Sequence, residues 1–213
     1  KTKMNRGIFI TIEGVEGVGK STNIEFIKQY LGNLNIDYLV TREPGGTLLA
    51  ENIRDLLLSI GDDSPVELCE LLLIFSARAQ HIEKVIEPAL KGGTWVICDR
   101  FTDATYAYQG GGRGMNAKLI SELETMVQGS LRPDLTIILD LDPETGLSRA
   151  RNRGELDRFE KEHVDFFMKV REVYLQIATN YPERCAVINA GNELDEVSRD
   201  IELLLKTRLF EAQ

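Results

Sequence analysis

A glycine-rich loop between a predicted strand and a predicted helix constrains this chain more than any other feature. Residues 14–21 read GVEGVGKS, the pattern G-x-x-x-x-G-K-S, and they follow the apolar run 8–12. A helical pattern then runs from Ser21 to Leu31. Strand, loop and helix in this order are typical of a phosphate-binding loop, in which backbone N–H groups surround an anion at the positive end of a helix. A glycine turn that arose by chance would not explain both flanking elements.

The loop offers both backbone and side-chain groups to a chain of phosphates. Lys20 supplies a full positive charge for the β- and γ-phosphates, and the Ser21 hydroxyl suits Mg²⁺. Glycines let the backbone turn its N–H groups inward. The residues expected to contact the nucleotide are Gly14, Val15, Glu16, Gly17, Val18, Gly19, Lys20, Ser21 and Thr22.

Apolar runs and helical patterns alternate along the chain. The apolar runs predict strands at 8–12, 36–40, 94–98, 135–141 and 185–189. Helical periodicity predicts helices near 20–32, 47–59, 66–91, 115–128, 143–152, 161–180 and 193–209. Most of the strands are apolar on both faces, as in a parallel sheet covered by helices. We therefore predict an α/β fold, a doubly wound five-stranded parallel sheet flanked by helices, as one domain over residues 1–213.

Composition narrows the class of function. The net charge of -9 argues against broad nucleic-acid binding but permits a local basic pocket for a small anion. No apolar stretch approaches membrane-spanning length, and no signal peptide is visible. Cys69, Cys98 and Cys185 are widely spaced and are interpreted as buried thiols in a reducing compartment. We therefore expect a cytoplasmic protein.

Charged residues follow several predicted strands, at the edge where parallel sheets bind ligands. Asp99 can hold Mg²⁺ beside Ser21, and Arg100 can grip a second phosphate, unless the two residues form a structural ion pair. Arg42, in the run T-R-E-P-G-G-T, has an equivalent place, and two arginines at one edge favour an anion clamp.

Other strand ends and turns carry residues with simpler interpretations. Asp140 competes with Asp99 for the metal role, whereas Asp142 precedes Pro143 and is interpreted as a helix N-cap. Thr47 can cap the helix that follows the P-G-G turn.

Two further clusters have a functional and a structural interpretation. Phe75 and Arg78 share a helical face and can stack on and read a nucleobase, although periodicity by itself favours a core phenylalanine with a partly buried arginine. Arg149, Arg151, Arg153 and Arg158 form a basic cluster within the charged segment 149–160. This segment is either a solvated charged face or a mobile lid that brings arginines onto a transferring phosphoryl group.

Together these motifs resemble the thymidylate kinase family of nucleoside monophosphate kinases, over essentially the whole chain. The matching motifs are T-R-E-P-G-G at 41–46, D-R-F at 99–101, Y-Q-G-G-G-R at 108–113 and R-A-R-N-R-G-E-L-D-R at 149–158. The last motif is similar to bacterial members that supply an arginine from the lid, whereas other relatives place one where this chain has Gly17. One departure is Ala104, where many relatives have a small hydroxyl residue.

The resemblance implies the activity and its reactants. The chain would phosphorylate dTMP to dTDP with ATP and Mg²⁺, in dTTP biosynthesis, by in-line transfer. Members usually pair as homodimers, and the helix patterns at 47–59 and 66–91 offer apolar faces that suit either an interface or the core. The expected partners are ATP and dTMP, with no nucleic acid and no membrane.

The resemblance also implies residue roles. Lys20 and Ser21 would bind the ATP phosphates and the metal, and Asp99 would help to organise Mg²⁺. Arg149 would reach ATP from the lid, and Arg153 would act in the transfer step. The residues implied to contact dTMP are Arg42 and Arg100 at its phosphate, Glu16 at the 3′-OH, Tyr108 at the 2′ position, and Phe75, Arg78, Thr105 and Gln109 at the base.

Two alternatives remain open. A kinase of the same fold can act on another (deoxy)nucleoside monophosphate. A nucleotide-binding switch protein is the alternative from another class, but it would carry an N-K-x-D guanine motif, which is absent from this sequence.

The lid assignment makes a direct prediction. Arg153→Ala is expected to lower turnover by about 10²–10³-fold, since this is the usual effect of removing one donor that stabilises transition-state charge. The affinity for dTMP should change much less. Steady-state kinetics measure both, and turnover within a few-fold of wild type would remove Arg153 from the transfer step.

Overall fold

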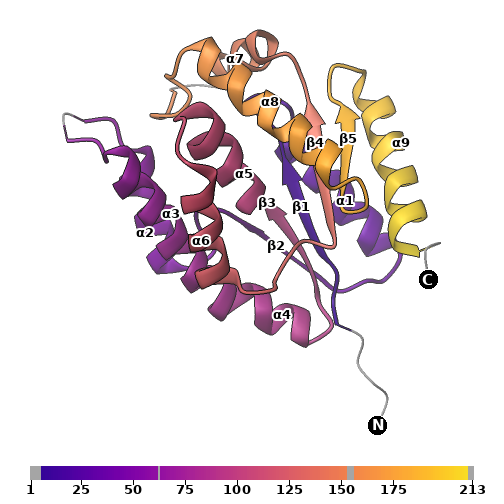
Figure 1. The fold of residues 1–213 in the computed structure, drawn as a ribbon. Helices are drawn as coiled ribbons and strands as arrows, with labels where there is room; N and C mark the ends of the chain where they lie inside the picture. The colour runs from indigo at the N-terminus through magenta and orange to yellow at the C-terminus, as the bar shows by residue number, and fades with distance from the viewer. Residues whose placement is uncertain (1–5, 62, 153–155, 211–213) are drawn as a thin grey trace.

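The computed structural model describes residues 6–61, 63–152 and 156–210, and in it five parallel strands form one sheet. The strand order is β2-β3-β1-β4-β5, and helices flank the sheet (Figure 1). The strands are β1 (Phe9–Glu13), β2 (Tyr38–Arg42), β3 (Trp95–Asp99), β4 (Leu135–Asp140) and β5 (Cys185–Asn189). The predicted fold class is confirmed, with strand ends displaced by one or two residues.

Helices alternate with the strands, as the sequence pattern predicts. They are α1 (Lys20–Asn33), α2 (Leu48–Leu58), α3 (Glu67–His81), α4 (Glu87–Lys91), α5 (Thr102–Thr105), α6 (Ala117–Gln128), α7 (Pro143–Arg151), α8 (Val164–Asn180) and α9 (Leu194–Leu205). The π-helical turns are η1 (Ile82–Ile86), η2 (Tyr106–Gly112) and η3 (Lys206–Phe210). The predicted helix 66–91 is present as α3, η1 and α4 in succession.

The helical stretch 102–112, which comprises α5 and η2, was not predicted. Its glycine run favours a turn by local propensity. Packing against α8 overrides that preference, because a Cβ on Gly111 would lie 2.7 Å from the Val173 side chain and one on Gly112 would lie 2.3 Å from the Phe166 ring. Glycine is therefore needed here for close approach of two helices.

The centre of the sheet is strand β1, which pairs with β3 on one side and β4 on the other. All five of its residues are buried. Phe9 packs with Ile86 and Leu90, whereas Ile10 and Ile12 belong to the larger core cluster that includes α1, α8 and α9. Helices on both faces of β1 therefore hold rigidly the strand that leads into the glycine loop.

The glycine loop packs directly against the start of α7. Gly17 has a φ of 72°, and a Cβ built on it would lie 1.9 Å from the Gly146 carbonyl oxygen. Gly146 in turn has no room for a Cβ, which would lie 2.3 Å from the Glu16 carbonyl oxygen. This contact sets the position of the loop relative to the segment predicted as a lid.

Local predictions for the caps are confirmed. The Asp142 side chain accepts a hydrogen bond from the Thr145 N–H at 3.0 Å, and Thr47 accepts one from the Ala50 N–H at 3.1 Å. Cys98 and Cys185 are buried as free thiols, but Cys69 is exposed on α3, contrary to prediction. None of the helices in the described ranges is long and apolar enough to cross a membrane.

The Gly17 contact predicts a large effect of adding one carbon. Gly17→Ala should cost about 2–5 kcal/mol of unfolding free energy, because left-handed strain adds to a collision with backbone. Gly114→Ala is the matched control, since Gly114 has a φ of 73° and no described atom lies within 4 Å of a Cβ placed there. It should cost only about 1–2 kcal/mol. Urea unfolding measures both, and equal losses would contradict the role of the Gly146 contact.

Candidate active site

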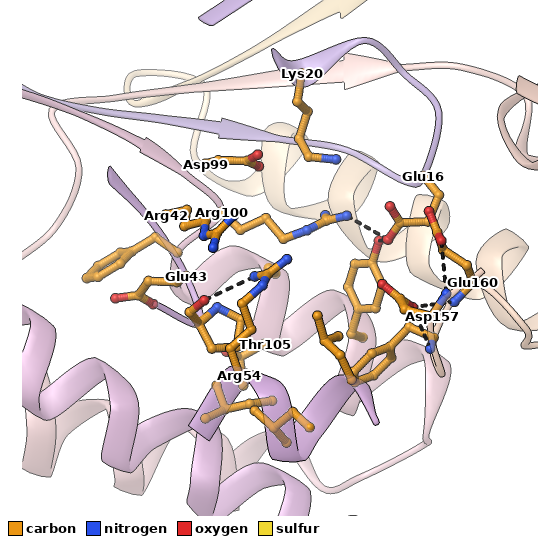
Figure 2. Close-up of a pocket in the computed structure, with 18 of the residues that line it drawn as sticks. Glu16, Lys20, Arg42, Glu43, Arg54, Asp99, Arg100, Thr105, Asp157 and Glu160 are labelled. Atoms are coloured by element: carbon orange, nitrogen blue, oxygen red, sulfur yellow. Dashed lines mark hydrogen bonds and ion pairs between the residues drawn. The ribbon is translucent and has the colours of Figure 1, made fainter. Parts of the chain in front are cut away.

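A cavity of about 580 Å³ opens at the carboxyl edge of the sheet. Most of the residues implicated by the sequence line it: Glu16, Gly17, Gly19, Lys20, Ser21, Thr22, Arg42, Arg78, Asp99, Arg100, Thr105, Tyr108, Gln109 and Arg149. Lys20, Asp99 and Arg100 face the same space in Figure 2. The glycine loop and the strand-end cations therefore share one cavity.

The glycine loop has the backbone that its sequence requires. Gly14, Gly17 and Gly19 all have positive φ, at 138°, 72° and 86°. Helix α1 begins at Lys20, so its free N–H groups point toward the loop. Burial lowers the pKa of Lys20, and the nearby Arg100 lowers it further. An anion bound at the glycine loop would offset the unfavourable burial of positive charge on Lys20 beside Arg100.

Arg100 adopts a strained backbone that aims its side chain at the loop. Its φ is 68°, a left-handed conformation that residues other than glycine rarely adopt. Its guanidinium donates to the Gly14 carbonyl at 2.6 Å and to Glu16 Oε1 at 2.7 Å. It also lies 4.8 Å from the ring centre of Tyr108, whose hydroxyl donates to the same Glu16 oxygen at 2.9 Å.

Arg54 is a cavity residue that sequence reasoning missed. It lies on α2, lines the cavity beside Arg42 and donates to the Pro44 carbonyl at 3.0 Å. Burial lowers the pKa of Arg54, and the charges of Arg42 and Arg100 lower it further. In the sequence it is one charge on an amphipathic helix, and only its place next to the T-R-E-P-G-G loop could have indicated a role.

Arg78 is almost completely buried, at 2% exposure, yet it reaches the cavity wall. Its Nε donates to Glu43 at 2.7 Å and its Nη2 donates to Thr105 at 2.9 Å. Glu43 also contacts the buried His81, at 2.9 Å. Within the described part of the chain, the buried Arg78 Nη1 has no hydrogen-bond partner. A buried donor of this kind calls for an acceptor from a ligand.

Phe75 is not among the residues that line the cavity, and its expected stacking role stays a prediction. It is 2% exposed and packs with Leu71 and Ile120 in a core cluster. Its neighbour Ile74 faces the cavity instead, together with Phe101. The Phe75 ring is nevertheless next to the cavity wall, because the guanidinium of the cavity-lining Arg78 lies 4.9 Å from the centre of that ring. The structure thus shows a buried phenylalanine in contact with a cavity-lining arginine.

The two candidate metal carboxylates differ in their surroundings. Asp140 is occupied by Arg171, which donates to both carboxylate oxygens at 2.6 and 2.8 Å. Asp99 lines the cavity, and its buried Oδ1 has no partner among the residues described. No group of three or more His, Cys, Asp or Glu side chains suited to a metal ion occurs in those residues. Asp99 and the Ser21 hydroxyl both line the cavity and can offer oxygen atoms to a cation at the loop.

The predicted lid is described only in part. Arg153 lies outside the described residues. Arg149 is exposed and lines the cavity. Arg158 does not line the cavity and donates to Glu70 at 2.5 Å and to the Leu57 carbonyl at 2.7 Å. Asp157, Phe159 and Glu160 line the cavity, and no sequence pattern indicated that acidic lid residues would do so (Figure 2).

Two groups of cations in one cavity, one on a phosphate loop and one on neighbouring elements, are typical of kinases that bring two phosphorylated substrates together. The fold and the site thus define a phosphate-binding-loop kinase. The family model described as thymidylate kinase matches residues 12–201. The chain belongs to the thymidylate kinase family.

Individual relatives agree with this assignment. Thymidylate kinase of Ectopseudomonas mendocina (strain ymp) is 56% identical over 203 residues, which cover 95% of this chain and 97% of the relative. That of Teredinibacter turnerae (strain ATCC 39867 / T7901) is 55% identical over 204 residues, covering 95% and 99%. The crystal structure of thymidylate kinase from Ehrlichia chaffeensis superposes with a TM-score of 0.77 at 35% identity, covering 94% of this chain and 99% of that chain.

A buried acid beneath the site predicts a pH effect on stability. Glu13 accepts hydrogen bonds from the Phe101 N–H at 2.7 Å and from the Tyr174 hydroxyl at 2.8 Å. Burial, with a smaller effect of Asp103, raises the pKa of Glu13 from 4.5 to about 8. Between these values the folded chain keeps a proton that the unfolded chain has lost, so its contribution to stability falls as pH rises.

Glu13→Gln removes this titration. The variant should gain stability relative to wild type as pH rises from 5 to 8, by on the order of a few kcal/mol. Urea unfolding at several pH values measures the difference between the two proteins, which cancels groups that titrate in both. A difference that stays constant with pH would contradict the raised pKa.

Proposed function

We propose that this chain transfers the γ-phosphoryl group of ATP to the phosphate of dTMP, with Mg²⁺, and so forms dTDP and ADP. The observation that carries the proposal is the shared cavity of Lys20 and Arg100. Arg100 even bonds to the carbonyl of Gly14 in the loop, at 2.6 Å, so the two cation groups are adjacent. Two phosphate groups bound to them would meet in one place.

The dTMP phosphate suits the strand-end cations. Arg42, Arg54 and Arg100 present three guanidinium groups, which bind phosphate oxygens in pairs. Glu16 and Tyr108 lie next to Arg100 and suit the sugar. An oxygen of the dTMP phosphate attacks the γ-phosphorus while the bond to the β–γ bridging oxygen breaks, and ADP leaves with that electron pair. The phosphate is already ionised, so the chain needs no catalytic base.

The base end suits thymine. The Arg78 Nη1 donor matches a carbonyl oxygen such as O4, and Thr105 and Gln109 lie beside it. Ile74 and Phe101 supply apolar walls. The stacking role expected of Phe75 stays a prediction.

The ATP end suits the glycine loop. Its N–H groups, Lys20 and Thr22 would hold the phosphates, with Arg149 at the rim and Arg153 from the lid. Asp99 and Ser21 would hold Mg²⁺, which in such sites takes few protein oxygens and several from water and phosphate. When bound, the ion neutralises charge on the phosphate oxygens. Arginines closing over the site would also exclude water, which competes as an acceptor.

We further propose that the enzyme is a cytoplasmic homodimer. Large apolar side chains stay exposed on α2 and α3, among them Leu48 at 82%, Leu56 at 58% and Leu68 at 51%. Large exposed apolar groups favour association with another protein surface where they form a continuous patch. The free cysteines suit a reducing compartment.

A coupled assay of ADP release tests the function. With ATP and Mg²⁺, the purified chain should release ADP rapidly when dTMP is present and at least about 10²-fold more slowly without it, because a kinase of this kind commits ATP only when the acceptor is aligned. A panel of monophosphates with dUMP, dCMP, dGMP and AMP should show preference for dTMP.

The Arg100→Met variant tests whether the measured activity comes from a contaminating kinase. It should lose most of the ADP release that is seen with dTMP. Arg132→Met is the matched control, since Arg132 is 41% exposed and pairs with Glu124 away from the cavity. ADP release that is independent of any acceptor, or a preference for another monophosphate, would refute the proposal.

A further inference from the structure

Glu70 does not line the cavity, yet it holds a side chain that does. It lies on α3 and is 1% exposed. Its Oε1 accepts a hydrogen bond from Gln109 Nε2 at 2.8 Å. Gln109 is itself 2% exposed and lines the cavity. The amide of a cavity residue is therefore anchored to a buried carboxylate.

Two arginines keep Glu70 as an acceptor of hydrogen bonds. Arg158 Nη2 donates to its Oε2 at 2.5 Å, and Arg113 Nε donates to its Oε1 at 3.3 Å. A guanidinium can only donate, and an ionised carboxylate can only accept. Gln109 must therefore turn its NH₂ group, not its oxygen, toward Glu70. The amide orientation thus follows from charge.

This orientation leaves the amide oxygen of Gln109 for a ligand. The hydrogen bond to Glu70 uses Gln109 Nε2, so Gln109 Oε1 is the amide atom that does not face Glu70. Thr105, one helical turn earlier, accepts from Arg78 Nη2, while Arg78 Nη1 has no partner there. The wall therefore presents a donor, Arg78 Nη1, and an acceptor, Gln109 Oε1.

A donor and an acceptor in this arrangement complement a carbonyl next to a ring N–H. Thymine and uracil have this pattern at O4 and N3–H. Cytosine has the opposite pattern, an amino group next to a ring nitrogen that accepts. A free glutamine amide can rotate by 180° and serve either pattern, whereas an anchored one serves a single pattern.

We propose that Glu70 is a positioning residue for base recognition: by fixing the Gln109 amide, it makes the site select a base with a ring N–H over one with an accepting ring nitrogen. The inference rests on the proposed function, because it requires the acceptor nucleotide to bind in this cavity. Glu70 acts through Gln109 and does not touch the base.

The test uses Glu70→Gln and the substrate pair dTMP and 5-methyl-dCMP, which differ only in the pattern read here. The variant side chain can offer its own NH₂ to Gln109, so the Gln109 amide is free to turn over. The ratio of kcat/KM for dTMP to that for 5-methyl-dCMP should fall by about tenfold or more, the usual effect of unpairing a buried polar group. A purely structural role would lower both values and leave the ratio unchanged.

Glu124→Gln is the matched control. Glu124 is another buried carboxylate, 9% exposed, which pairs with Arg132 and accepts from the Tyr106 hydroxyl outside the cavity. For this variant, the ratio of kcat/KM for dTMP to that for 5-methyl-dCMP should equal the wild-type ratio. If Glu70→Gln does not fold, the ratio of kcat/KM for dTMP to that for 5-methyl-dCMP is measured for Gln109→Leu instead. This variant leaves Glu70 and its two arginines in place, and its ratio should fall equally.

An unchanged ratio in the folded Glu70→Gln variant, or in Gln109→Leu, overturns the inference. The outcome is separable from that of the proposed function. When wild type phosphorylates dTMP and the ratio does not move, only the role of Glu70 is lost. When wild type does not phosphorylate dTMP, both proposals fall.

Discussion

Repulsion between like charges in one cavity is the constraint on which the rest of the site depends. The charges of Arg42 and Arg100 lower the pKa of Arg54, in a chain whose net charge is -9. Carboxylates in and next to the cavity wall hold guanidinium groups in place: Glu51 for Arg42, Glu16 for Arg100, Glu43 for Arg78 and Glu70 for Arg158. Such pairs orient donors before a substrate arrives, so that little reorganisation accompanies binding or transfer. Four of the acidic residues of the chain thus serve a basic site.

Close backbone approach is the second element of this arrangement. The Gly17–Gly146 contact joins the glycine loop to α7, from which the predicted lid continues. The left-handed backbone of Arg100 aims its side chain at the Gly14 carbonyl. Both features cost free energy and persist only because the sheet and its helices hold the surrounding backbone. Rigid strands ending at one edge thus set the distances between the two cation groups.

Sequence reasoning succeeded where the information is local. The strands, most of the helices, the caps at Thr47 and Asp142 and the glycine loop follow from neighbouring residues. It failed where a distant element decides. The helical stretch 102–112 depends on packing against α8, and Arg54 becomes a cavity residue only because α2 folds back over the end of β2. Phe75 and Ile74 show how much one residue along α3 matters, since Ile74 lines the cavity whereas Phe75 is buried against Arg78.

The sequence by itself determined that this chain builds a parallel α/β sheet with a phosphate-binding loop, because periodicity and a glycine pattern act over a few residues. Its motifs also determined the family. Only the tertiary structure decided which side chains meet: that Arg78 keeps one donor unpaired among the described residues, that Asp140 is occupied by Arg171, and that Glu70 anchors Gln109. The physical reason is that hydrogen bonds between buried groups depend on distances of a few tenths of an ångström between elements far apart in the chain.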